Sequence, residues 1–200
     1  MLYALDIEST GLSPLESKMV SVAIAAPEES LVLVSEDEAS LFYDLTAWLK
    51  NARREPGIIV TWNGAGFDWP YMYTRAQMLG VSEFLNELTI VEHEERKPTY
   101  NPIAGHTGGY AVNFAGHDHA DIMRPWKSWS SAQKISNSLK SVAKANGIEV
   151  IEVDRTKITE LSRAELVAYN ISDVAATLTL AEKLGTEIDS WQDSKLIAGR

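Results

Sequence analysis

The sequence predicts an α/β fold in which helices flank a mixed five-stranded sheet, within a single domain spanning residues 1–200. Three observations support it. The chain has 200 residues, of which 45% are hydrophobic and 23% charged, an ordinary composition for one globular domain. Short β-rich runs dominate its first third, and patterns with a 3.6-residue period follow. Residues 92–118 show no period and predict a long irregular loop or an irregular hairpin inserted into the domain.

Five short apolar runs predict the strands, at residues 2–7, 18–25, 31–34, 58–61 and 119–123. A Pro-Glu-Glu-Ser turn separates the second run from the third, so the first three strands are expected to form an antiparallel meander. The fifth run ends just before Pro125, which a strand interior does not tolerate.

Helices are predicted between Ser35 and Arg53 and over residues 69–79, 139–146 and 163–184. Ser35 is the expected N-cap of the first helix, with Glu38 completing a capping box. Ser138 and Ser162 are expected to cap the last two helices. By analogy, this order of strands and helices is that of the ribonuclease H-like fold.

Composition excludes several kinds of site. The chain has no cysteine, which rules out disulfides, thiolate nucleophiles and cysteine-held metal clusters. No apolar run reaches the roughly 20 residues that span a bilayer. The start of the sequence lacks the basic and apolar regions of a secretory signal, so a cytoplasmic protein is expected.

The net charge is −10, which by itself argues against a polyanionic partner. A site that binds divalent cations needs acidic ligands, however, and two such ions would move the charge by +4, from −10 to −6. Net charge therefore does not decide whether the partner is a nucleic acid.

Three acidic motifs stand out. Asp6 and Glu8 are one residue apart on a predicted strand, so their side chains share one face. Asp68 follows a glycine-rich turn and opens a predicted helix. Tyr169 and Asp173 are four residues apart on the last helix and can face one site. Taken singly, each motif has a plain structural reading: a solvated strand end, a helix N-cap and an exposed helix flank.

The last helix carries an apolar stripe formed by Val167, Ile171, Val174, Leu178 and Ala181. At 100° per residue, Tyr169 and Asp173 are expected to lie together but beside this stripe.

Together, the motifs Asp6-Ile7-Glu8-Ser9-Thr10-Gly11-Leu12, Asn63-x3-Phe67-Asp68 and Tyr169-x3-Asp173 resemble those of the DEDD exonucleases in the DnaQ-like superfamily. The match is to the tyrosine subclass, which includes the proofreading domains of family B DNA polymerases. This resemblance implies a metal-dependent 3′→5′ exonuclease that uses two Mg²⁺ or Mn²⁺ ions. It also implies that Asp6, Glu8, Asp68 and Asp173 are the metal ligands and that Tyr169 orients the attacking water.

The same resemblance implies that the substrate is single-stranded DNA or a frayed 3′ end, cleaved to nucleoside monophosphates. It implies a polymerase or replication protein as a partner in trans. Two alternatives stay open, an exoribonuclease and a non-catalytic nucleic-acid-binding module. Ser9, Thr10 and Leu12 match positions that line the pocket for the 3′-terminal nucleotide in the family, and Asn63 and Phe67 are further candidates for substrate binding. Core packing is the alternative for Leu12, and it is favoured over base stacking for Phe67.

Two further features have competing interpretations. The alternating set His117, His119 and Asp121 suggests a metal site, but without a strong third ligand hydrogen-bonded histidines are favoured; the other two histidines are His93 and His106. A segment that mixes aromatic and basic residues could stack the bases of a single strand, or could pack its tryptophans beneath a loop. Its members are Arg124, Trp126, Lys127, Trp129 and Lys134.

Overall fold

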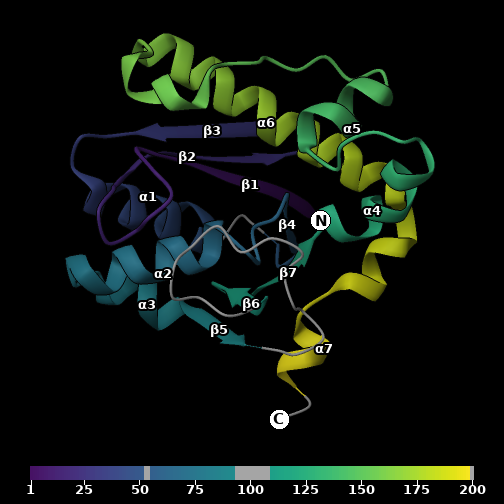
Figure 1. Ribbon diagram of the computed structural model, residues 1–200. Helices are drawn as coiled ribbons and strands as arrows, with labels where there is room; N and C mark the ends of the chain where they lie inside the picture. The colour runs from purple at the N-terminus through teal and green to yellow at the C-terminus, as the bar shows by residue number, and fades with distance from the viewer. Residues whose placement is uncertain (52–54, 93–108, 199–200) are drawn as a thin grey trace.

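The computed structural model describes residues 1–51, 55–92 and 109–198. The chain forms three layers, with a seven-stranded sheet between two groups of helices. The long helix α6 (Arg163–Leu184) lies across one face of the sheet, while α1 (Glu38–Lys50) and α2 (Asp68–Leu79) lie on the other (Figure 1). The remaining helices are α3 (Ser82–Glu87), α4 (Met123–Ala132), α5 (Leu139–Ala145), the 3-10 helices η2 (Arg155–Glu160) and η3 (Gly185–Trp191), and α7 (Ser194–Ile197).

The sheet has the strand order β3-β2-β1-β4-β7-β6-β5. Its strands are β1 (Leu2–Ser9), β2 (Met19–Ala26), β3 (Glu29–Val34), β4 (Ile58–Thr61), β5 (Leu88–Glu92), β6 (Tyr110–Phe114) and β7 (His117–Asp121). The first three strands form the expected antiparallel meander. Strands β1, β4 and β7 are parallel neighbours, so their carboxyl ends lie at one edge of the sheet.

All five predicted strands are present, and the ribonuclease H-like α/β fold is confirmed, but the predicted number of strands was wrong. β5 and β6 extend the sheet beyond β7. Of the two alternatives for residues 92–118, the loop is wrong where β6 and β7 form, whereas the antiparallel pairing of β5 with β6 agrees with an irregular hairpin. Ala115 and Gly116 have φ of 51° and 80° and make the tight turn between β6 and β7. The glycines on either side of β6 made this short strand look like part of a loop. Its pairing with β5 on one side and β7 on the other specifies it as a strand. Residues 93–108, with His93 and His106, lie outside the described residues.

Two predicted boundaries also need correction. α1 is capped by Asp37, whose side chain accepts a hydrogen bond from the Ala39 N–H, and not by Ser35. Glu38 cannot complete a capping box because its carboxylate accepts from the Met19 N–H and pairs with Arg75. The strand predicted at residues 119–123 spans His117–Asp121, and α4 begins at Met123.

Pro125 marks the start of α4 because it sits in the first helical turn. There the backbone N–H has no partner within the helix, so proline is tolerated. The caps predicted at Ser138 and Ser162 are confirmed, the second as a full capping box with Glu165. No helix in the described part of the chain is long and apolar enough to cross a bilayer.

Side chains of β1 alternate between two hydrophobic cores. Tyr3, Leu5 and Ile7 belong to the core beneath α1 and α2. Ala4 belongs to the core beneath α6, so Asp6 and Glu8, at the same alternation, point to the α6 side. The strand therefore delivers two carboxylates toward α6 while its other face anchors it in the larger core.

His117 should make the protein less stable below about pH 6.5. The Gly57 N–H donates to its Nδ1 over 3.2 Å, which requires a neutral ring, and its Nε2 lies 3.4 Å from the Leu49 carbonyl oxygen. Burial lowers the pKa of His117. The unfolded chain therefore takes up a proton before the folded chain does, and this stability is lost as the pH falls, by at most about 1.4 kcal/mol per pH unit.

Urea unfolding at about pH 7.5 and about pH 5.5 measures the effect. His117→Gln keeps an acceptor for the Gly57 N–H but cannot titrate, so its loss of stability between these values should be smaller. An equal loss in both proteins would show that His117 does not titrate in this range.

Candidate active site

The predicted carboxylates of β1 lie at its carboxyl end, next to α6. Asp6 pairs with Ala23 and Glu8 with Ser21 across the antiparallel ladder, and the register shifts between Glu8 and Ser9. Such an irregularity bends a strand and re-aims the side chains beside it. Glu8 is buried, whereas Asp6 is half-buried.

α6 buries most of the expected apolar stripe and, beside it, the third motif. Val174, Leu178 and Ala181 are buried as predicted, and Val167 is half-buried. Tyr169 and Asp173 are 1% and 0% exposed, whereas Ile171 is 39% exposed. The helix packs on β1 and β2, so the buried face includes the polar residues that lie opposite these strands. The prediction is wrong for Ile171, because periodicity alone ranks an isoleucine above a tyrosine and an aspartate as the buried residue.

The structure brings Asp6, Glu8 and Asp173 together, with one carboxylate oxygen of each within 4.8 Å of the others. Within the described ranges this is the one group of three metal-ligating side chains at such distances. Three carboxylates at this spacing repel one another and need a compensating cation. Hard carboxylate oxygens of this kind suit Mg²⁺ or Mn²⁺.

Asp68 lies beside this group but outside it. Its Oδ1 accepts a hydrogen bond from the Ile7 N–H over 3.2 Å, which ties the start of α2 to β1 between Asp6 and Glu8. Burial, and then the negative charge of Asp6, raises the pKa of Asp68 well above its usual range. A fourth carboxyl therefore lies at the end of β1, near enough to Asp6 to interact with its charge.

Two residues of the site were missed in the sequence. Lys140 of α5 donates to Oδ1 of Asp173, and its Nζ lies 4.5 Å from the centre of the Tyr169 ring. Asn170 is fully buried; its Oδ1 accepts from the Ser21 hydroxyl, and its Nδ2 donates to Oδ2 of Asp6 over 3.4 Å. Nothing local distinguishes a lysine on a short helix, but Asn170 stands three residues before Asp173 and so shares its helical face.

Three of the predicted substrate residues lie at the end of β1 and in the loop that follows it: Ser9, Thr10 and Leu12. The Ser9 hydroxyl donates a hydrogen bond to the Gly11 carbonyl over 2.8 Å. The Thr10 hydroxyl accepts one from the Lys18 N–H over 3.1 Å. Leu12 is 59% exposed, which excludes a role in core packing. The loop thus presents an apolar side chain to solvent, four residues after Glu8.

A buried ion pair holds this loop in place. Arg75 of α2 bonds to Glu38 with its Nε and Nη2 and donates from Nη1 to the Pro14 carbonyl over 2.9 Å. Glu38 in turn accepts from the Met19 N–H at the start of β2 over 2.8 Å. The loop that carries Leu12 is therefore fastened to two helices of the opposite layer.

The other two predicted substrate residues lie in the turn before α2. Asn63 has a φ of 68°, a left-handed conformation that asparagine tolerates, and its N–H donates to Asp121 over 2.9 Å. Phe67 is half-buried and packs on Tyr71, with ring centres 5.3 Å apart. Phe67 is thus partly a core residue, with part of its surface still accessible.

For both the histidine set and the segment of aromatic and basic residues, the structure favours a role in packing. His117 and His119 are buried and hydrogen-bonded to residues other than Asp121, and they are not part of a metal-ligand group within the described residues. Trp126 and Trp129 pack edge-to-face, 5.1 Å apart, against the α6-side core, while Lys127 and Lys134 are exposed. The tryptophans are therefore structural.

Comparison with known proteins agrees with this arrangement. A family model described as "DNA polymerase family B, exonuclease domain" matches residues 13–142, an interval that includes the Asp68 turn. The catalytic chain of DNA polymerase epsilon from Eremothecium gossypii is 30% identical over 156 residues, covering 76% of this chain and 6% of that protein. A DNA polymerase of Thermococcus litoralis is 28% identical over 136 residues, covering 65% of this chain and 8% of that protein.

A solved structure shows the same fold. The family B DNA polymerase from Pyrobaculum calidifontis superposes with a TM-score of 0.65 at 22% identity, covering 92% of this chain and 24% of that one. The chain thus spans a small part of the length of the polymerases it matches. From the family match over residues 13–142, the chain belongs to the exonuclease-domain family of family B DNA polymerases.

Proposed function

We propose that this chain is a divalent-metal-dependent 3′→5′ exonuclease that degrades single-stranded DNA or frayed 3′ ends to nucleoside monophosphates. The observation that carries the proposal is the group of Asp6, Glu8 and Asp173, whose carboxylate oxygens lie within 4.8 Å of one another. It lies at the sheet edge where β1, β4 and β7 end, beside a fourth buried carboxyl on Asp68.

The donor set fits divalent cations. Asp6, Glu8 and Asp173 would hold them, with Asp68 close enough to Asp6 to support the site. Two Mg²⁺ or Mn²⁺ ions would supply an activated water and stabilise the leaving 3′ oxygen. Lys140 offsets one of the negative charges and would shift toward a phosphate oxygen once substrate is present.

The uncharged side chains of the site would orient the attacking water and bind the substrate. Tyr169 is buried next to Asp173 on the same face of α6, where its hydroxyl would orient the attacking water. The exposed Leu12 would contact the 3′-terminal nucleotide, and Ser9, Thr10, Asn63 and Phe67 are the further candidates for substrate binding. Because the relatives are DNA polymerases, DNA is the favoured substrate, and a polymerase or replication protein is the expected partner.

The test is an end-labelled assay on matched single strands of DNA and RNA, each with Mg²⁺, Mn²⁺ or EDTA. We expect a 3′→5′ ladder on DNA that EDTA abolishes. A faster ladder on RNA would make the protein an exoribonuclease. Binding without cleavage would indicate a non-catalytic module, and cleavage in EDTA would refute the metal-dependent mechanism.

Tyr169→Phe should lower turnover by about 10²-fold, the lower end of the range for a group that assists proton transfer. The ring and its packing beneath Lys140 are retained, so protein stability and Mn²⁺ binding should change little. Single-turnover rates and Mn²⁺ titration measure the two quantities separately. An equal loss of both would show that Tyr169 supports the metal ligands and does not orient water.

A further inference from the structure

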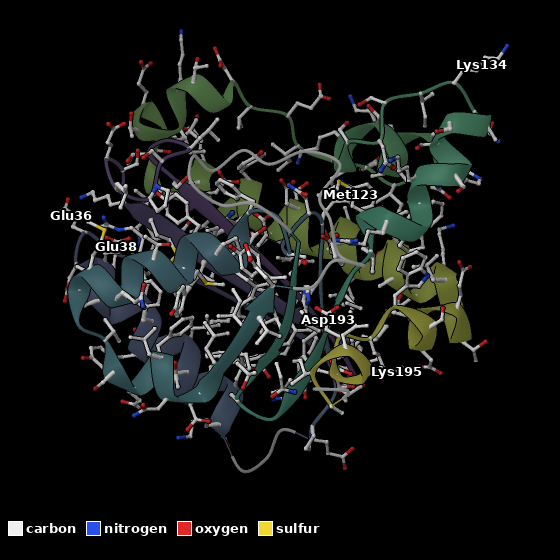
Figure 2. All side chains as sticks on the ribbon, turned by 60° about the horizontal axis from the view of Figure 1, so that its bottom comes forward. Glu36, Glu38, Met123, Lys134, Asp193 and Lys195 are labelled. Atoms are coloured by element: carbon white, nitrogen blue, oxygen red, sulfur yellow. The ribbon has the colours of Figure 1, made fainter. Side chains whose placement is uncertain are left out.

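A buried chain of hydrogen bonds links the segment after α6 to the turn that carries Asp68. Asp193 Oδ2 lies 2.6 Å from Nδ1 of His119, and Nε2 of His119 lies 2.8 Å from Oγ1 of Thr61. Thr61 Oγ1 in turn accepts from the Gly64 N–H over 3.1 Å. Figure 2 labels Asp193 at the start of α7.

The order of donors and acceptors is complete when His119 is neutral. Its Nδ1–H donates to Asp193, its Nε2 accepts from the Thr61 hydroxyl, and that hydroxyl accepts from Gly64. The same sequence of groups occurs in serine hydrolases, but here the three side chains are at most 2% exposed. Because no substrate can reach Thr61, a nucleophilic role is excluded and a positioning role is the alternative.

The turn depends on this hydroxyl for its geometry. A Cβ on Gly64 would lie 2.2 Å from Oγ1 and 2.5 Å from Cβ of Thr61, so the backbone passes directly over the threonine. The same turn continues into α2, where the Trp69 ring packs on His119 with centres 5.6 Å apart. His119 therefore contacts the helix immediately after Asp68 as well as the start of the turn.

Strand β7 holds the turn at a second point. Oδ1 of Asp121 accepts from the N–H groups of Asn63 and Met123, at 2.9 and 3.1 Å. Two side chains of one strand, His119 and Asp121, thus hold consecutive parts of the turn from the same side. The end of the turn is where Asp68 accepts from the Ile7 N–H of β1.

Asp193 is well placed to fix His119. Its Oδ2 also accepts from the Val112 N–H over 3.0 Å, and its own N–H donates to the His119 carbonyl over 2.9 Å. The neighbouring Ser194 makes a separate anchor, donating from its N–H and hydroxyl to Asp118 over 2.8 and 2.5 Å. One segment therefore has two anchors on β7, of which only Asp193 reaches the His119 ring.

We propose that Asp193, His119 and Thr61 form a positioning relay that sets the place of Asp68 at the nuclease site. Asp193 orients the imidazole, the imidazole orients the threonine hydroxyl, and the hydroxyl holds the turn that leads into α2. None of the three touches substrate. The catalytic part of this inference rests on the proposed function, whereas the structural part does not.

The variants come in pairs that separate the relay from general damage. Thr61→Val removes the hydroxyl at nearly constant shape, and Thr61→Ser restores it. Asp193→Ala breaks the bond to His119, whereas Asp193→Asn retains an acceptor for it. Ser194→Ala is the matched control, because it weakens the same segment at Asp118 without touching His119.

For Thr61→Val and Asp193→Ala we expect kcat to fall about 10- to 100-fold, the range for groups that orient a ligand from behind it, with KM nearly unchanged. Thr61→Ser, Asp193→Asn and Ser194→Ala should remain within about threefold of wild type. A loss in Ser194→Ala equal to that in Asp193→Ala would assign the effect to docking of the segment and overturn the relay. A wild-type kcat in Thr61→Val would overturn it as well.

Amide exchange of Gly64, followed by NMR, tests the structural part without any activity. Its exchange should accelerate at least about tenfold in Thr61→Val and Asp193→Ala, and stay at the wild-type rate in Ser194→Ala. If wild-type protein shows no nuclease activity, the proposed function fails, yet this measurement still decides the relay. Unchanged exchange at Gly64 in Asp193→Ala would overturn it.

Discussion

Asp173→Asn is expected to reduce exonuclease activity by more than about 100-fold, beyond the range seen when only an outer partner of a metal ligand is lost. Asparagine keeps the size of the side chain but removes one negative charge and one hard ligand from the group of Asp6, Glu8 and Asp173. Since Asp173 is fully buried, no solvent ligand can easily take its place.

Thermal unfolding with and without Mn²⁺ provides a readout independent of turnover. A ligand that binds only the folded state at about 100 times its Kd stabilises by about 2.7 kcal/mol. For a chain of this size that corresponds to a rise in Tm of roughly 5–10 °C. The wild-type protein should show this rise, and Asp173→Asn should show little of it.

Asp44→Asn on α1 is the matched control, because it removes the same charge from an exposed position away from the group. It should retain both activity and the Mn²⁺-dependent rise in Tm. Full activity in Asp173→Asn, or an unchanged rise in Tm, would contradict the assignment of Asp173 as a metal ligand.

Lys140→Met is expected to change metal affinity and turnover in opposite directions. The Lys140 ammonium pairs with Asp173 and is 15% exposed, so it offsets part of the charge of the three carboxylates. Without it the group is more negative, and Mn²⁺ should bind about tenfold more tightly. The rate at saturating metal should nevertheless fall about tenfold or more, because a charge-assisted contact to phosphate is lost.

Lys144→Met, one turn later on α5, is the control. Lys144 pairs with Glu152 at the surface, where both side chains are more than half exposed. Such pairs contribute little, so neither metal affinity nor turnover should change. If Lys140→Met gave tighter metal binding with undiminished turnover, Lys140 would act only as a competitor of the metal and not at the phosphate.

Local patterns were sufficient to locate the elements that carry the acids. Alternation placed Asp6 and Glu8 on one face of a strand, and the Ser162 cap with Glu165 defined the start of α6. These signals act over a few residues, so they survive without knowledge of the rest of the chain. The same locality explains the errors. β6 forms by pairing with β5 and β7, and Glu38 pairs with Arg75 and so does not complete the capping box expected with Ser35.

The sequence by itself determined the type of fold, the three acidic motifs and their places on a strand, a turn and a helix. Only the tertiary structure showed that the buried face of α6 extends from the predicted apolar stripe to Tyr169 and Asp173, while Ile171 is exposed. It alone showed Lys140 beside Asp173 and Asp193 behind His119. These contacts join residues far apart in the chain, and packing against the sheet sets them, which no local pattern records.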